Sequence, residues 1–300
     1  MQDQTPSDHR QVLLLLGEGK SFRTNQERDQ WAHTRLMSLG AKNLNLLIST
    51  PTAFIAEVEL STSAKKLDER SKELFDSEGF DFGLIPSSSY FAKKKLIAFD
   101  LDSTLIAAEG IDELARELGV FDQVSEITER AMDGNLNFES SFCERVQLLR
   151  GLTLSQIEHV VDRIAFSPGV EQLFQTLKKQ SIQIAVLSGG FDFIAEKLKK
   201  TGVIDYLYTN RLEFKEGIAT GVPLLPIIDG NAKKELLSRL MTDHGFLPEE
   251  VIAVGDGAND IGMIQLAGIS VGFRAKPALQ KHSDLLLRHR PLSDLSYLVN

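Results

Sequence analysis

Short apolar segments of strand length alternate with helical segments from Leu96 to the end of the chain. The clearest strands are predicted at Leu96–Phe99, Ile182–Leu187 and Val251–Val254, with weaker candidates at Tyr206–Tyr208 and Ile269–Val271. Apolar strands separated by helices are typical of a parallel sheet that is covered on both faces. The pattern therefore predicts an α/β fold with a doubly wound parallel sheet.

The segment between the first two predicted strands is long and helical. From Ile111 to Ile164 the apolar residues follow helical spacing, and we find no strand pattern. We interpret this segment as a helical cap, about residues 110–165, inserted after the first strand. A small hairpin is also expected where Leu212–Phe214 and Ile218–Thr220 flank Gly217.

The first ninety residues have a different organisation. Strands are predicted at Val12–Leu16, Leu44–Ser49, Ala53–Leu60 and Phe80–Ile85, and helices at Asn25–Leu39 and Ala64–Phe75. The order βαββαβ is the ferredoxin-like pattern. Pro86–Ser89 resembles a linker, so we expect two units, residues 1–88 and 90–300. A piece beginning near Tyr90 is then expected to fold and keep the chemistry.

Composition argues against several classes of function. The net charge is −9, and the longest basic runs, Lys93–Lys95 and Lys199–Lys200, are too short for a nucleic-acid surface. The single cysteine, Cys143, excludes an internal disulfide and favours a reducing compartment. No apolar stretch approaches the ~20 residues that span a bilayer, and no signal peptide is visible. We therefore expect a cytoplasmic protein that binds neither nucleic acid nor membrane.

Each of the three clearest strands leads into a polar segment. These segments are Asp100–Thr104, Ser188–Gly190 and Gly255–Asp260, and Lys233 lies between the last two. Ligands of open α/β sheets bind beyond the carboxyl ends of the strands, so we expect the three segments to meet. Carboxylates suit Mg²⁺, glycine N–H groups and a serine hydroxyl suit phosphate, and lysine supplies a point charge. This set of groups favours phosphoryl transfer.

In this order, the polar segments resemble the four motifs of the haloacid dehalogenase-like phosphatases, and the resemblance covers essentially all of Leu96–Asn300. It implies that Asp100 attacks phosphorus and that Asp102 acts as general acid and base. The remaining residues expected to contact the substrate around the phosphate are Ser188, Gly189, Lys233 and Asn259.

A magnesium site is expected in the same place. Asp100, Asp256 and the backbone carbonyl of Asp102 are the expected ligands of one Mg²⁺ ion. Asp260 is then expected to orient Lys233 or one of the ligands.

Four stretches are similar to phosphoserine phosphatases in particular: Asp100–Glu113, Thr128–Arg145, Leu187–Phe191 and Val254–Asp260. The resemblance implies that Glu109 faces the amine of phosphoserine and that Arg145 clamps its carboxylate. It also implies that Met132 and Phe138 close over the site. Arginine matches a carboxylate bidentately, and glutamate has the right charge for an ammonium group.

The residues alone favour a plainer interpretation of the same insertion. Without the resemblance, Met132 and Phe138 are better explained as core side chains. Arg145 is then better explained by an ion pair with Glu139 or Glu144.

The first unit is similar to ACT-type amino-acid-sensing domains, with no ligand residue that can be carried over. A role as scaffold or dimerisation module is an equal alternative. A homodimer and an amino-acid effector at this unit are both left open.

Three other functions remain to be weighed. The first is a phosphatase of the same family for another small phosphomonoester, or a phosphotransferase to an alcohol. The second is an amino-acid-binding regulator with an inactive phosphatase half, which the intact Asp100, Asp102, Lys233 and Asp256 argue against. The third is a phospho-accepting receiver module, which would lack the helical insertion of Ile111–Ile164.

Overall fold

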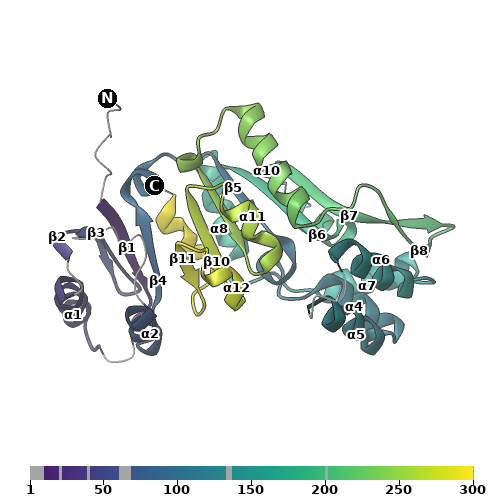
Figure 1. The fold of residues 1–300 in the computed structure, drawn as a ribbon, viewed down its shortest axis with the longest axis horizontal. Helices are drawn as coiled ribbons and strands as arrows, with labels where there is room; N and C mark the ends of the chain where they lie inside the picture. Colours follow the sequence, from purple (N-terminus) through teal and green to yellow (C-terminus); the bar gives the residue numbers. More distant parts are fainter. Residues whose placement is uncertain are drawn as a thin grey trace.

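The computed structural model describes residues 10–19, 22–38, 41–60, 69–132, 137–199 and 202–299. Its strands are β1 (Arg10–Leu16), β2 (Ala41–Thr50), β3 (Ala53–Leu60), β4 (Asp81–Pro86), β5 (Leu96–Phe99), β6 (Gln183–Phe191), β7 (Tyr206–Lys215), β8 (Ile218–Leu224), β9 (Val251–Gly255), β10 (Ile269–Phe273) and β11 (Leu285–Leu287). They form one sheet in the order β2-β3-β1-β4-β11-β10-β9-β5-β6-β7-β8. Figure 1 shows this sheet running from the first unit to the β7–β8 hairpin.

Parallel strands in the middle of the sheet bring the polar segments to one edge. β5 pairs in parallel with β6 and with β9, and Phe99 lies opposite Val186 and Val254. The residues that follow these three positions therefore lie at the same level of the sheet. The α/β fold with a parallel central sheet is confirmed, and β11 is a strand that the sequence did not predict.

Strand β6 continues further than expected. The sequence predicted a strand end at Leu187, but the extended backbone runs to Phe191, which pairs with Asn210 on β7. The pairing register shifts between Leu187 and Phe191, so the Ser188–Gly190 segment is an irregular part of the strand. Glycine does not by itself end a strand, and it accommodates such an irregularity.

Helices cover both faces of the central sheet. The helices outside the insertion and the first unit are α3 (Ser87–Phe91), α8 (Val170–Lys179), α9 (Asp192–Lys199), α10 (Gly230–His244), α11 (Ile261–Ile264) and α12 (Pro277–Gln280). Alternate residues of β5 enter two different cores. Phe99 belongs to the same core as Phe174 of α8, whereas Ala98 belongs to the core that contains Leu237 of α10. Alternation of this kind is what a sheet buried on both faces requires.

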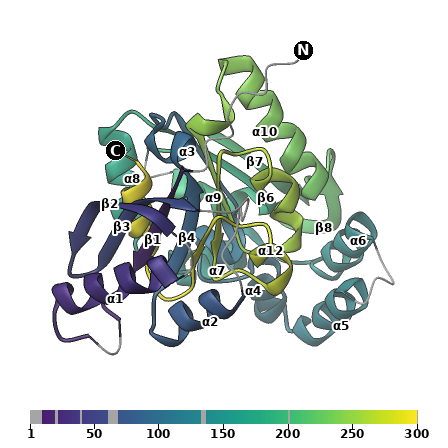
Figure 2. The ribbon, with the colours of Figure 1, turned by 60° about the vertical axis from the view of Figure 1, so that its left-hand side comes forward.

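The described part of the insertion after β5 is mainly helical. It comprises α4 (Gly110–Leu118), α5 (Phe121–Met132), α6 (Phe138–Leu148) and α7 (Leu154–Arg163). Its two ends are joined by backbone bonds, since Ala107 N–H donates to the Ala165 carbonyl and Ser167 N–H to the Leu105 carbonyl. Figures 1 and 2 show the four helices grouped beside the β7–β8 hairpin.

The first unit has the predicted element order. Helices α1 (Asn25–Ser38) and α2 (Glu69–Ser77) alternate with β1 to β4 as βαββαβ. The expected start of the second helix, residues 64–68, lies outside the described residues. Among the helices of the described chain, none combines the length and the apolar character that a membrane span requires.

The prediction of a linker at Pro86–Ser89 is wrong. Pro86 ends β4, and the serines that follow begin helix α3, in which Ser87, Ser89 and Tyr90 are buried. The ammonium group of Lys94 donates to the carbonyls of Ser89 and Ala92 at the end of this helix. Serine is common both in linkers and at helix starts, so composition could not separate the two.

The first unit shares the sheet with the rest of the chain. β4 pairs antiparallel with β11, and Gly83 and Phe82 lie opposite Leu285 and Leu286. Beyond this pairing, the carboxylate of Asp81 accepts backbone N–H bonds of 2.7–3.1 Å from residues 288, 289 and 290. The apolar core also continues across this boundary. The two sequence units are therefore joined by packing and hydrogen bonds, and not only by the chain.

Candidate active site

Asp100 lies directly at the end of β5 and is 4% exposed. Its Oδ1 accepts a 2.7 Å bond from the backbone N–H of Leu101, which begins a wide turn at Leu101–Leu105. Ser103 has a φ of 56° in this turn, and its N–H donates to the Ala108 carbonyl at 3.0 Å. The turn thus fixes Asp100 and brings the chain back toward the strand ends.

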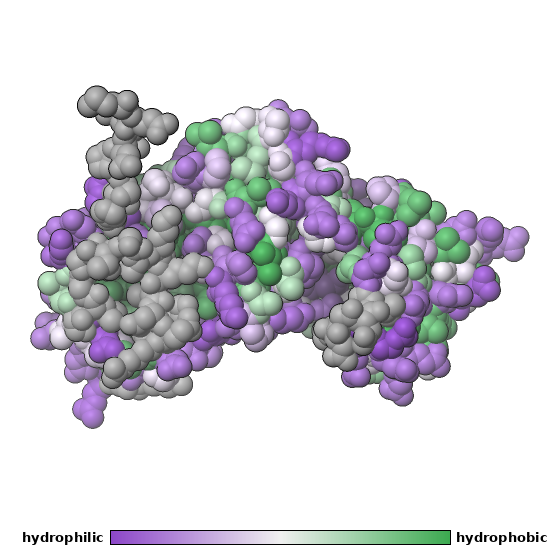
Figure 3. Space-filling model, viewed as in Figure 1, coloured by the Kyte–Doolittle hydropathy of each residue, from purple (hydrophilic) through white to green (hydrophobic). Residues whose placement is uncertain are grey.

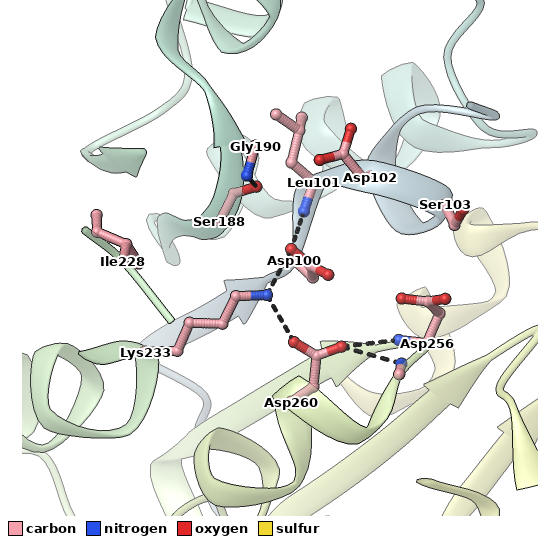
Figure 4. Close-up of polar contacts among 12 residues, drawn as sticks. Asp100, Leu101, Asp102, Ser103, Ser188, Gly190, Ile228, Lys233, Asp256 and Asp260 are labelled. Atoms are coloured by element: carbon pink, nitrogen blue, oxygen red, sulfur yellow. Dashed lines mark hydrogen bonds and ion pairs between the residues drawn. The ribbon is translucent and has the colours of Figure 1, made fainter. Parts of the chain in front are cut away.

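Lys233 lies between two buried carboxylates. Its Nζ is 2.7 Å from Asp100 Oδ1 and 2.8 Å from Asp260 Oδ1, as Figure 4 shows. Burial by itself lowers the pKa of Lys233, but the charges of Asp100 and Asp260 outweigh burial and raise the pKa. The ammonium group is therefore held charged beside Asp100.

Asp260 has both carboxylate oxygens engaged. Oδ1 accepts from Lys233, and Oδ2 accepts bonds of 3.1 Å from the N–H groups of Asp256 and Gly257. A Cβ at Gly255 would lie 2.4 Å from Asp260 Oδ2, so this turn closes only around glycine. The geometry agrees with the expected part of Asp260 in orienting Lys233.

Three acidic residues lie close enough to share a cation. Asp100, Asp256 and Asp260 each offer an oxygen, and these oxygens lie within 4.8 Å of one another. Because the oxygens of Asp260 are already bonded within the protein, Asp100 and Asp256 are the carboxylates best able to bind an ion. Hard oxygen donors of this kind fit Mg²⁺.

Asp102 is held against the insertion. Its Oδ1 accepts a 2.9 Å bond from the N–H of Gly110, at the start of α4. Burial first, and then the charge of Glu109, raise the pKa of Asp102 to about 7. The carboxyl group can therefore both hold and release a proton near neutral pH, as a general acid and base requires.

A cavity of about 690 Å³ lies between the strand ends and the insertion helices. The predicted site residues that line it are Asp100, Asp102, Glu109, Phe138, Arg145, Gly189, Asp256 and Asn259. Ser188 and Lys233 are buried next to this group and do not line the cavity. Figure 3 shows a hollow between the central body and the insertion. The side chain of Met132 lies outside the described part of the structure.

Arg145 lines the cavity, and its Nε donates to the Ser141 carbonyl at 3.2 Å. Burial lowers the pKa of its guanidinium group, and the negative charges of Asp112, Glu109 and Asp102 oppose this effect. Glu144, one of the two partners that the plainer interpretation proposed beside Glu139, instead pairs with Arg130 at 3.3 Å. The structure therefore places Arg145 at the cavity and gives Glu144 another partner.

Phe138 satisfies both interpretations of the sequence. It packs against the apolar core and stacks on Phe142, with ring centres 5.9 Å apart. It also lines the cavity opposite Gly189, where a Cβ would lie 3.3 Å from the phenyl ring. A side chain can thus be part of the core and still form one wall of a binding site.

Sequence reasoning missed Lys276. Its Nζ lies 3.0 Å from Asp256 Oδ2 and 3.9 Å from Glu109 Oε1, at the edge of the cavity. The residue follows β10, whose carboxyl end lies at the same edge of the sheet. The strand-end rule would have found Lys276 if the weaker strand at Ile269–Val271 had been examined in the same way.

Comparison with known proteins identifies the class of this chain. The family model of the haloacid dehalogenase-like hydrolases matches residues 94–268, which is more than half of the chain. The chain therefore belongs to the haloacid dehalogenase-like hydrolase family. A relative from Methanocaldococcus jannaschii, named phosphoserine phosphatase, is 43% identical over 203 residues, covering 68% of this chain and 96% of that protein.

Two further matches extend the comparison. A phosphoserine phosphatase from Archaeoglobus fulgidus is 41% identical over 221 residues, covering 74% of this chain and 64% of the relative. A solved structure of a haloacid dehalogenase family hydrolase from Salmonella enterica serovar Typhi has a TM-score of 0.83 at 28% identity. That match covers 97% of this chain and 99% of the other, so it includes the first unit.

Proposed function

We propose that this chain is a phosphoserine phosphatase, which hydrolyses O-phosphoserine to serine and phosphate, the last step of serine biosynthesis. One observation carries the proposal: a single cavity contains the acidic groups of the family site together with Glu109 and Arg145. Phosphoserine has a phosphate, an ammonium group and a carboxylate, and this cavity offers a complement to each. The names of the relatives support the same substrate.

The reaction proceeds in two transfers. In the first, a carboxylate oxygen of Asp100 forms a bond to phosphorus, the ester bond breaks, and Asp102 donates a proton to the departing serine oxygen. In the second, Asp102 removes a proton from water, and the resulting hydroxide displaces Asp100 from the aspartyl-phosphate. Lys233 supplies fixed positive charge beside Asp100 in both transfers.

The metal belongs to the same proposal. Asp100, Asp256 and the backbone carbonyl of Asp102 would hold Mg²⁺, which supplies positive charge beside the transferring phosphoryl group. Asp260 holds Lys233 in place and is not one of the expected ligands, so Asp100 and Asp256 are the two carboxylates that would bind the ion.

The parts around the site have proposed functions as well. We infer that residues 110–165 act as a cap that closes the cavity and excludes water during transfer. We retain residues 1–88 as an ACT-like unit and 90–300 as the phosphatase unit, with one shared sheet. An amino-acid effector at the first unit, a homodimer and a cytoplasmic location stay predictions.

A substrate panel tests the proposed function. Phosphate release should be fastest from phosphoserine among small phosphomonoesters, should stop on exhaustive chelation and should return with Mg²⁺. A parallel assay with an acceptor alcohol measures transfer instead of hydrolysis. Preference for an ester without an amino-acid group, or transfer that exceeds hydrolysis, would favour the alternative functions. Full activity in metal-free protein would exclude the magnesium site.

Arg145 should determine specificity more than rate. Arg145→Met should slow phosphoserine hydrolysis by roughly 10- to 150-fold, because a charge-assisted bidentate bond in a closed cavity contributes on the order of 1.5–3 kcal/mol. An aryl phosphate, which has no carboxylate, should lose much less. The measurement is the ratio of kcat/KM for the two substrates.

Arg130→Met is the matched control for Arg145. It removes a cation from the same insertion, but one that pairs with Glu144 on the exposed surface. We expect the substrate ratio of this variant to equal that of the parent protein. Equal losses on both substrates in Arg145→Met would mean that Arg145 is structural.

A further inference from the structure

Asn210 is a buried amide on β7 whose side chain joins two segments of the site. It is 1% exposed, and its Nδ2 donates to the carbonyl of Gly189 at 2.9 Å and to that of Ile228 at 3.2 Å. Its Oδ1 accepts from the N–H of Ile228 at 2.7 Å. Both donor hydrogens and the acceptor oxygen are therefore used on the backbone of two segments of the chain.

The bond to the Gly189 carbonyl fixes the orientation of the peptide group between Gly189 and Gly190. In a trans peptide the carbonyl of Gly189 and the N–H of Gly190 point in opposite directions. Asn210 holds the carbonyl, so the N–H is directed away from Asn210 and donates to Ser188 Oγ at 2.8 Å. Ser188 Oγ thus accepts one bond and keeps its own hydrogen to donate, as a phosphate-binding hydroxyl must.

The same peptide lies against the proposed general acid. A Cβ at Gly190 would lie 2.2 Å from Asp102 Oδ2. A small rotation of this peptide would therefore change the position of Ser188 and the space around Asp102 together. The bond from Asn210 to the Gly189 carbonyl and the bond from Gly190 N–H to Ser188 Oγ hold the two ends of this peptide in place.

The bonds to Ile228 fix the other segment. Ile228 is held through both its N–H and its carbonyl, and the next residue, Asp229, caps α10 through a 2.8 Å bond from Ala232 N–H. The backbone N–H of Lys233 in turn donates to the Asp229 carbonyl at 3.0 Å. The start of the helix that carries Lys233 is thereby attached to the same amide as the Ser188 segment.

We propose that Asn210 is a positioning residue for phosphoryl transfer, which sets the Ser188–Gly190 segment and Lys233 at their working distance. The proposal rests on the proposed function in that phosphoryl transfer occurs at Asp100. Asn210 acts only on groups around the phosphate, and so it affects every phosphomonoester alike. An aspartate here would keep the acceptor for Ile228 N–H but would face two carbonyls without a donor.

Asn210→Asp in the full chain is the first test. Because a displacement of about 1 Å around the reacting group can cost about 100-fold, we expect kcat to fall by roughly 10- to 100-fold. The loss should be the same for phosphoserine and for p-nitrophenyl phosphate. Asn43→Asp makes the same chemical change on β2, where Asn43 bonds to Glu59, and should leave kcat unchanged. An unchanged kcat in folded Asn210→Asp would overturn the proposal.

A double-mutant cycle separates positioning from a general loss of stability. Ser188→Ala should remove the part of the Asn210→Asp effect that acts through the Ser188 hydroxyl, so the combined loss should be smaller than the product of the two single losses. If the two losses multiply, Asn210 does not position Ser188 and the proposal is contradicted. Should Asn210→Asp fail to fold, Asn210→Ser, which introduces no charge, takes its place in the same cycle. A loss of activity that matches the fraction of unfolded protein also contradicts the proposal.

A wrong substrate assignment and a wrong role for Asn210 would give different results. If the parent protein hydrolyses p-nitrophenyl phosphate but not phosphoserine, then the substrate assignment is wrong. The cycle on p-nitrophenyl phosphate still decides the part played by Asn210.

Discussion

Asp100→Asn should abolish phosphate release from phosphoserine, with a loss on the order of 10⁴-fold or more, as for removal of other covalent nucleophiles. The amide has the shape of the carboxylate but lacks the charged oxygen that attacks phosphorus. The parent protein, quenched in acid during turnover of radioactive phosphoserine, should retain a hydroxylamine-sensitive label. The variant should retain none.

The fold of this variant must be verified separately, because Asp100 is one of the two carboxylates bonded to Lys233. Asp260 remains as the other, so we expect circular dichroism and the thermal midpoint to change little. Asp243→Asn, on the exposed surface of the helix that carries Lys233, is a matched control and should keep full activity. Normal turnover in Asp100→Asn would mean that another group attacks phosphorus.

Removal of residues 1–86 should destabilise the remaining chain strongly. The truncation deletes the strand that pairs with β11 and leaves three backbone N–H groups without Asp81. Each lost hydrogen bond contributes about 0.5–1.5 kcal/mol, and apolar side chains of the shared core become exposed, so the loss should exceed about 3 kcal/mol in total. Urea denaturation measures it, and sedimentation detects association through the exposed edge of β11.

Asp81→Ala in the full chain tests the same contact by removing one carboxylate and leaving the first unit in place. It should lower the free energy of unfolding by about 3 kcal/mol, whereas Glu73→Gln, on the exposed side of α2, should have little effect. A truncated protein with the urea midpoint and the activity of the full chain would show that the first unit is dispensable.

Local sequence signals were sufficient for the centre of the fold. The strand at Leu96–Phe99 and the acidic residues after it were predicted because a buried strand and its polar end are adjacent in sequence. Asp260 follows from the strand-end rule, whereas Lys233 lies on α10 and was placed beside it by the resemblance to the family motifs.

What the sequence did not predict depends on contacts between distant segments. β11 is only three residues long, and its pairing with β4 joins positions about two hundred residues apart. Asn210 has no motif of its own, because its importance comes entirely from the loops that it bonds. Short strands and single amides of this kind become visible only in three dimensions.

The shared sheet also limits how the first unit could influence catalysis. A hinge between the two units would have to break the pairing of β4 with β11 and the bonds of Asp81. A ligand bound to the first unit would therefore act by twisting strands that remain paired, and not by swinging one lobe against the other. The mechanical path runs from β4 through β11 and β10 to β9, and the next residue along that last strand is Asp256.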